Sequence, residues 1–247
     1  MKKITIQLFI ILFFFYGKAV AQQVFLEKVN IEFARTVTVW PLLKEMDPSW
    51  YEQVKSNYPQ ESVNYYSFVS DGKKSLYKQS KEAQITRNSI LSYFPNENVI
   101  YNDYSNSTTV SQKVSYGENF LLQDSLLNIR WQITPDTRVI AGFECRKAVG
   151  VIYDSIAVFA FYTDEIKVSG GPEGINGLPG MILGVGVPKL HMTWFATKVN
   201  IATDTDIRSV TPATKGSKTN RSKMVSDINA ATQGWTWGRK VFMALLL

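Results

Sequence analysis

The chain has 247 residues, of which 45% are hydrophobic and 13% aromatic, and its formal net charge is +6. This length and apolar content suit one large domain with a buried core. The single cysteine excludes an intrachain disulfide, and so modest a charge indicates no nucleic-acid partner.

The first 21 residues have the pattern of an export signal. Lys2 and Lys3 precede a mostly apolar stretch, Ile4–Tyr16, that is short for a membrane span, and Ala19-Val20-Ala21 fits the A-x-A cleavage pattern. Loss of the three leader lysines lowers the net charge from +6 to +3. We therefore expect residues 1–21 to be a signal peptide and the mature chain to be periplasmic, outer-membrane-associated or secreted. No later apolar run has the length of a transmembrane helix, so none is expected in the mature chain.

The first elements of the mature chain are strands followed by a helix. Val24–Val39 has the composition of one or two strands, which Trp40-Pro41 ends. Asp47, followed by proline, has the pattern of a helix N-cap with proline at the first helical position. We therefore expect a short helix over Ser49–Asn57.

Short β-type stretches then recur at spacings of about ten residues, with turn residues between them. Asp71-Gly72 favours a tight hairpin turn, and Ala83–Glu97 is expected to be mostly loop. The expected strands are Ser62–Val69, Lys73–Gln79, Asn98–Tyr104, Thr108–Tyr116, Glu118–Gln123, Asn128–Ile133, Val139–Ala148, Ile156–Thr163, Met181–Val187, Leu190–Val199 and Ile207–Val210. This series predicts a mainly β fold: a single domain with a curled antiparallel sheet or partly open barrel and one or two short helices.

The C-terminal part differs in composition. Lys215–Lys223 carries four basic residues and no acid, and Val241–Leu247 is entirely apolar. We therefore expect a β-rich domain over residues 22–210, followed by a basic linker and an apolar tail over residues 211–247.

The stretch Gly170–Pro188 contains seven of the fifteen glycines and three of the nine prolines. Pro179-Gly180 suits a type II turn with positive φ at the glycine, and Met181–Val187 reads as a buried strand. Gly184 and Gly186 indicate a bulge or a close backbone contact. No Lys-Ser/Thr pair follows, so a phosphate-binding loop is not favoured.

The heptapeptide Gly177–Leu183 resembles the naming motif of the GLPGLI family, with Met181 where that family usually has Leu. The resemblance extends over Trp131–Val187, although Phe161 stands where the family commonly carries Trp. The resemblance implies a secreted or envelope protein of the Bacteroidota. It implies a location and a fold rather than a defined reaction.

Candidate catalytic groups are few. Cys145 lies in an expected strand and His191 is the only histidine, so a cysteine or serine hydrolase would have to use one or both of them. A buried apolar cysteine and a hydrogen-bonded strand histidine are the commoner outcomes for such residues. Asp164-Glu165 and the pair Asp204 and Asp206 read as exposed surface carboxylates. No metal site and no cofactor are expected. One histidine cannot form a multi-histidine site, although it could join a carboxylate in a weak transition-metal site.

The aromatic side chains are the most prominent feature. They suit either core packing of a large curved sheet, which is the commoner case, or an apolar cavity on its concave side. The hypothesised ligand-binding residues are Trp131, Phe161 and Trp194 as walls, with Gly177, Leu178, Pro179 and Gly180 as the adjoining turn. The sequence thus favours a non-catalytic binding protein for a hydrophobic ligand or an envelope partner. The alternatives are a hydrolase using Cys145 and His191, and a structural component docked on an outer-membrane protein.

Overall fold

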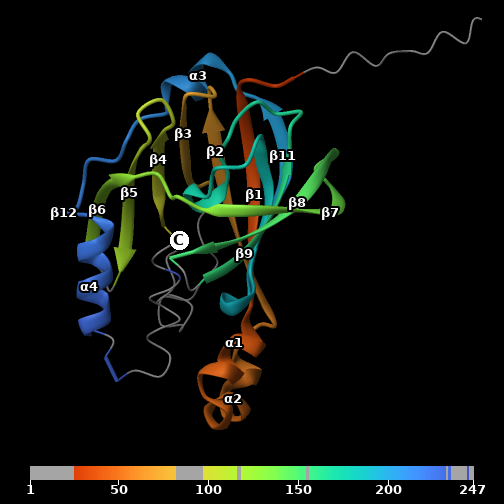
Figure 1. Ribbon diagram of the computed structural model, residues 1–247. Coiled ribbons are helices and arrows are strands. Elements are labelled where there is room, and N and C mark those ends of the chain that lie inside the picture. Colours follow the sequence, from red (N-terminus) through yellow and green to blue (C-terminus); the bar gives the residue numbers. More distant parts are fainter. Residues whose placement is uncertain are drawn as a thin grey trace, which may run out of the picture.

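A computed structural model describes residues 25–81, 97–115, 118–153, 156–231, 233–234 and 244. The strands in these residues form one open sheet in the order β12-β6-β5-β4-β3-β2-β1-β11-β10-β9-β8-β7. Neighbouring strands are antiparallel except β12, which runs parallel to β6. The sheet curls so that β7 and β8 run across the direction of β1 to β3 (Figure 1). The prediction of a mainly β, single-domain curled sheet is confirmed.

Most of the expected strands appear close to their expected places. The strands are β1 Val29–Thr38, β2 Glu61–Ser70, β3 Lys74–Gln79, β4 Val99–Asp103, β5 Thr108–Ser115, β6 Glu118–Ser125, β7 Arg130–Ile140, β8 Phe143–Ile152, β9 Ile156–Thr163, β10 Met181–Val187, β11 Met192–Ile201 and β12 Ser217–Thr219. The expected signal peptide and nearly all of the apolar tail lie outside the described residues, as does most of the expected loop over 83–97.

The central strand β1 shows why the sheet forms. Its residues alternate strictly between buried and half-buried, so that Val29, Ile31 and Phe33 all lie in the core with no exposed surface. Alternation of this kind buries one face of a strand, and burial of each such side chain contributes about 1.5–3 kcal/mol. Arg35 shares this buried face, and its guanidinium lies over the Tyr66 ring at 5.2 Å from the ring centre.

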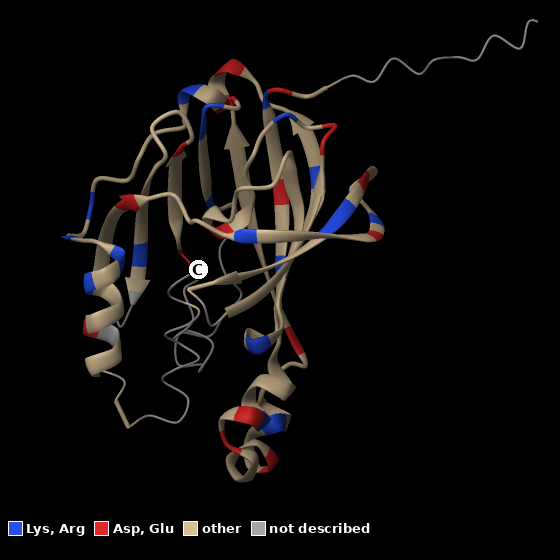
Figure 2. Ribbon diagram, in the orientation of Figure 1, with Lys and Arg blue, Asp and Glu red and all other residues tan. Residues whose placement is uncertain are grey.

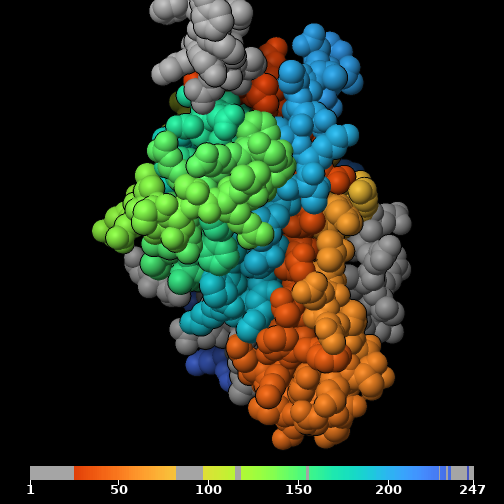
Figure 3. Space-filling model, turned by 90° about the vertical axis from the view of Figure 1, so that its right-hand side faces the viewer, coloured from red at the N-terminus to blue at the C-terminus, as the bar shows by residue number. Residues whose placement is uncertain are grey.

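Two short helices follow β1 at one end of the sheet: α1 (Val39–Met46) and α2 (Pro48–Val54), which continues into a single 3₁₀ turn, Lys55–Asn57. The predicted cap is confirmed, because the Asp47 carboxylate accepts hydrogen bonds of 2.9 Å from the backbone N–H groups of Ser49 and Trp50. Figure 3 shows these helices, in orange, extending the sheet at its end rather than covering a face.

Two parts of the C-terminal third differ from expectation. The strand expected over Ile207–Val210 is wrong: Asp204–Arg208 forms helix α3. The reason is a capping box, in which Thr203 accepts from the Asp206 N–H while the Asp206 carboxylate accepts from the Thr203 N–H. Within the expected linker, β12 pairs with β6, and helix α4 (Arg221–Ala231) follows it directly.

The loop before β10 is a rigid corner. It contains the 3₁₀ turn η3 (Pro172–Gly174), and a second such turn, η4 (Pro188–Leu190), follows β10. Gly180 has a φ of +147°, and a β-carbon there would collide with the Thr163 carbonyl. A β-carbon on Gly186 would likewise overlap the Phe159 ring, and the register of β10 with β9 shifts just before Gly184. The expected bulge and close contacts are therefore present.

Charges of both signs are interspersed over the molecule (Figure 2). Among the residues that the structure describes, no helix has the length and apolar character needed to cross a membrane.

Candidate functional site

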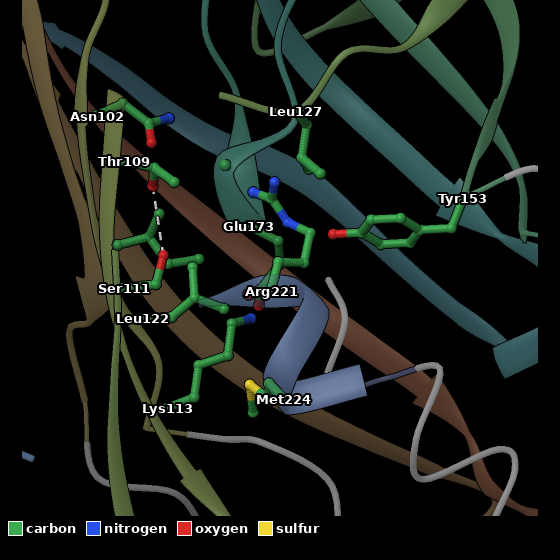
Figure 4. Close-up of a pocket in the computed structure, with 12 residues that line it drawn as sticks. Asn102, Thr109, Ser111, Lys113, Leu122, Leu127, Tyr153, Glu173, Arg221 and Met224 are labelled. Atoms are coloured by element: carbon green, nitrogen blue, oxygen red, sulfur yellow. Dashed lines mark hydrogen bonds between the residues drawn. The ribbon is translucent and has the colours of Figure 1, made fainter. Parts of the chain in front are cut away.

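A small polar pocket lies on the inner side of the sheet, between the wall formed by β4, β5 and β6 and the segments η3 and α4 (Figure 4). Its cavity measures about 20 Å³, which is room for about one water molecule. The lining residues are Ile100, Asn102, Thr109, Ser111, Lys113, Leu122, Leu127, Tyr153, Glu173, Gly174, Arg221 and Met224. We call this set the Lys113 pocket.

The strand β5 supplies a polar row to the pocket. Thr109, Ser111 and Lys113 alternate along the strand, so their side chains share one face, and all three are at least 94% buried. Thr109 donates to the Tyr101 carbonyl at 3.2 Å, whereas Asn102 on β4 stands directly opposite Thr109 in the antiparallel pair. A strand that turns polar groups inward at alternate positions builds a polar patch within an otherwise apolar interior.

Lys113 is the unusual member of this row. Its side chain is almost completely buried, and within the described part of the chain its Nζ has no hydrogen-bond partner. Burial lowers the pKa of Lys113 from 10.5 to about 8, although the negative charge of Glu173 acts in the opposite direction. Figure 4 shows the amine pointing into the pocket toward Glu173 and Arg221.

Glu173 provides the carboxylate of the pocket from the turn η3. Its backbone lies in the left-handed region, with φ of +52°, and only 2% of the residue is exposed. The Asn98 amide donates to Oε2 at 2.9 Å and the Tyr77 hydroxyl donates to Oε1 at 3.3 Å. Burial and the neighbouring carboxylate both raise the pKa of Tyr77 well above its ordinary value, which keeps this hydroxyl a donor.

Arg221 closes the pocket at the start of α4. Its guanidinium lies 3.4 Å from the Asp124 carboxylate and donates to the Ser125 carbonyl at 3.1 Å. The Asp124 carboxylate also accepts from the Arg221 backbone N–H at 2.9 Å. The guanidinium carbon lies 5.9 Å from the centre of the Tyr153 ring. Arg221 is thus held in place by an ion pair, and its charge is largely balanced by Asp124.

The aromatic residues singled out from the sequence lie elsewhere. Trp194 is 1% exposed and Phe161 is 8% exposed, and both pack in the hydrophobic core. Trp131 is half-buried, and its indole N–H donates to the Asn176 carbonyl at 2.9 Å, which fastens β7 to the loop before Gly177. Leu178 in that loop is buried, and its carbonyl accepts from the Ser169 hydroxyl at 2.8 Å.

A second hollow, of about 430 Å³, lies on the outer side of the sheet over β7, β8 and β9. It is lined by Arg130, Gln132, Val149, Gly150, Val151, Ala157, Val158, Phe159 and Pro188. Neither this hollow nor the Lys113 pocket contains any of the seven residues named from the sequence as ligand-binding.

The structure does not support the hydrolase based on Cys145 and His191. Cys145 lies on β8 with no exposed surface, and burial raises the pKa of its thiol to about 12. His191 lies in the turn before β11 and forms a 2.9 Å hydrogen bond with the Glu45 carboxylate of α1. A catalytic thiol requires the opposite arrangement, with a lowered pKa and a base within reach. Among the described residues, no group of three or more metal-ligating side chains is present.

The fold and the polar pocket place the protein in the class of mainly β domains that have an open curled sheet and a buried polar site. The family model "N-glycanase peptide, N-terminal domain" matches residues 57–222, about two thirds of the chain, and the chain belongs to this family. A solved structure titled "Structure of PNGF-II in C2 space group" superposes with a TM-score of 0.52 at 16% identity, over 88% of this chain and 33% of that chain. A second, "Structure of PNGF-II in P21 space group", gives 0.50 at 16% identity, over 78% and 32%. No curated protein matches.

Two predictions are corrected by these findings. The assignment to the GLPGLI family is wrong, because the family model that matches residues 57–222 is that of the N-glycanase N-terminal domain. The heptapeptide Gly177–Leu183 indicated the wrong family, because a tight turn into a buried strand selects glycine and proline for backbone reasons alone. The non-catalytic binding protein for a hydrophobic ligand is also wrong, since the matching family model is the N-terminal domain of an N-glycanase. The present chain spans about a third of the length of the solved structures.

None of the polar residues of the Lys113 pocket was predicted from the sequence as a site residue. One signal was available: in Thr108–Ser115 three polar residues alternate with a strand period, and one of them is lysine. Such a pattern is usually the solvent face of a strand, because lysine is almost never fully buried. Only the curl of the sheet, which turns this face toward η3 and α4, shows that the polar row lines a pocket and does not face solvent.

Proposed function

We propose that the protein acts on N-glycosylated proteins as a domain of the N-glycanase type and takes part in cleaving the amide bond between the glycan and its asparagine. The observation that carries the proposal is the family match over residues 57–222. All of the pocket-lining residues except Met224 lie within this match. The expected export signal supports the proposal, since it would bring the protein to glycoproteins outside the cytoplasm.

The Lys113 pocket carries polar groups of the kind that bind a glycan, and its cavity of about 20 Å³ has room for one oxygen-sized group of such a ligand. Sugars are recognised through hydroxyl and amide groups, and the pocket offers buried donors and acceptors of the matching types. Glu173 is the pocket's carboxylate, and a carboxylate positioned by two donors is the type of group that amide hydrolysis uses for general acid–base work. The outer hollow is less suited, because its lining is mainly apolar.

The test is hydrolysis of a synthetic N-glycopeptide in oxygen-18 water, followed by mass spectrometry of the peptide. Hydrolysis of the amide bond between the glycan and its asparagine converts this asparagine into an aspartate that carries one heavy oxygen atom. We expect the protein to produce this aspartate, and Glu173→Gln to slow its formation at least tenfold. The matched control is Glu144→Gln, which removes an exposed carboxylate on β8. Unmodified glycopeptide after prolonged incubation with the unaltered protein would refute the proposal.

A further inference from the structure

A buried stack of side chains crosses three neighbouring strands and ends at Glu173. Strands β1, β2 and β3 lie side by side in the sheet (Figure 1). They contribute Arg35, Tyr66 and Tyr77, which are diagonal neighbours in the two antiparallel ladders. The rings of Tyr66 and Tyr77 are parallel to within 7°, with 5.0 Å between their centres. Arg35 lies over the Tyr66 ring, so the stack joins a buried cation to the residue that contacts the buried carboxylate.

The stack leaves the Tyr77 ring little freedom. All three side chains are at most 2% exposed, and neighbours in a close-packed interior prevent a large ring from swinging aside. Burial raises the pKa of Tyr66 and of Tyr77 above the ordinary value, so both hydroxyls keep their protons at neutral pH. The Tyr77 hydroxyl is thus a fixed donor, 3.3 Å from Glu173 Oε1.

Glu173 depends on side-chain contacts for its orientation, because it lies in the turn η3 rather than in a strand. Its two carboxylate oxygens accept from different residues: Oε2 from the Asn98 amide at 2.9 Å, and Oε1 from Tyr77. A carboxylate held at one oxygen can still rotate about that contact, whereas hydrogen bonds to both oxygens fix its plane. The plane matters for proton transfer, which requires the acting oxygen to be aligned with the reacting group.

We propose that Tyr77 is a positioning residue for the hydrolysis: its hydroxyl, held by the stack on Tyr66, sets the plane of the Glu173 carboxylate. This inference rests on the proposed function, because it specifies how the carboxylate of the same site is oriented. The contact of 3.3 Å is long for a hydrogen bond between oxygens, and such bonds at catalytic groups often tighten only as the transition state forms. Tyr77 therefore acts on the chemical step rather than on substrate binding.

The test is Tyr77→Phe, which removes the hydroxyl and keeps the ring in the stack. Steady-state kinetics follow the oxygen-18 aspartate formed from the synthetic N-glycopeptide. We expect kcat to fall about tenfold and KM to stay within about twofold, because one hydrogen bond to a charged group has this magnitude. Urea denaturation of both proteins shows whether they are equally folded under the assay conditions, so that a smaller folded fraction does not imitate the effect.

Tyr104→Phe is the matched control. The Tyr104 hydroxyl lies 2.8 Å from the Ser75 Oγ, so this variant also loses a hydrogen bond of a tyrosine hydroxyl, but none to Glu173. Its kcat is expected to equal that of the unaltered protein. Crystal structures of the three proteins give a readout that does not depend on activity. The Glu173 carboxylate should keep its plane in Tyr104→Phe, and should turn or occupy more than one orientation in Tyr77→Phe.

The outcomes distinguish this inference from the proposed function. Cleavage by the unaltered protein with the same kcat in Tyr77→Phe, or a carboxylate that keeps its single orientation in that variant, would overturn the positioning role alone. No cleavage by the unaltered protein, with a carboxylate that turns in Tyr77→Phe and not in Tyr104→Phe, would refute the function and leave Tyr77 as the residue that orients Glu173.

Discussion

Replacement of Lys113 by methionine should stabilise the protein at neutral pH. In the folded state burial lowers the pKa of Lys113 from 10.5 to about 8. Such a difference corresponds to about 3 kcal/mol of destabilisation at pH 7, where the lysine is charged in both the folded and the unfolded state. Methionine fills similar space without a charge, so Lys113→Met should raise the free energy of unfolding by about this amount.

The pH dependence gives the sharper test. Between pH 8 and pH 10.5 the unfolded chain holds the Lys113 proton and the folded chain does not. The unfolded state therefore binds more protons in this window, and the stability of the unaltered protein rises with pH there. The variant lacks this contribution. The free energy of unfolding of Lys113→Met should therefore exceed that of the unaltered protein by about 3 kcal/mol at pH 7, and this difference should fall toward zero near pH 10.5.

Urea denaturation at pH 7, 9 and 10.5 measures this difference, with Lys218→Met as an exposed control expected to stay within about 0.5 kcal/mol of the unaltered protein. Other titrating groups contribute equally to both proteins and cancel in the comparison. A difference that does not change with pH would refute the reasoning, because the gain would then come from packing. A variant less stable than the parent at pH 7 would refute it as well.

Three further predictions concern the scaffold. Asp47→Ala removes the carboxylate that caps α2 and should lower the free energy of unfolding by about 1 kcal/mol in urea titration. Gly180→Ala should cost at least about 2 kcal/mol in the same assay, since its β-carbon would meet the Thr163 carbonyl at a φ of +147°; an unchanged midpoint would contradict the rigid corner. Cys145 should not react with a disulfide reagent at pH 8 in the native protein, because it is buried and its thiol has a pKa of about 12; reaction before unfolding would contradict its assigned burial.

The features that were predicted correctly from the sequence depend on residues that lie close together along the chain. Asp71-Gly72 predicted the β2–β3 hairpin, in which the Asp71 carboxylate accepts from the backbone of Lys73 and Lys74. Asp47 predicted the start of α2 for the same reason. The short helix α3 was mistaken for a strand, although Thr203 and Asp206 carried the spacing of a capping box. The error arose because five residues are too few for a helical period to show.

A mainly β domain can be predicted from the amino-acid sequence alone, because strand alternation and turn chemistry act over a few residues at a time. The sequence alone does not determine the site. Glu173 and Lys113 lie on separate elements, and only the curl of the sheet brings η3 and α4 over β5. Whether an alternating polar strand faces water or encloses a pocket depends on what packs against it, and that is a property of the tertiary structure alone.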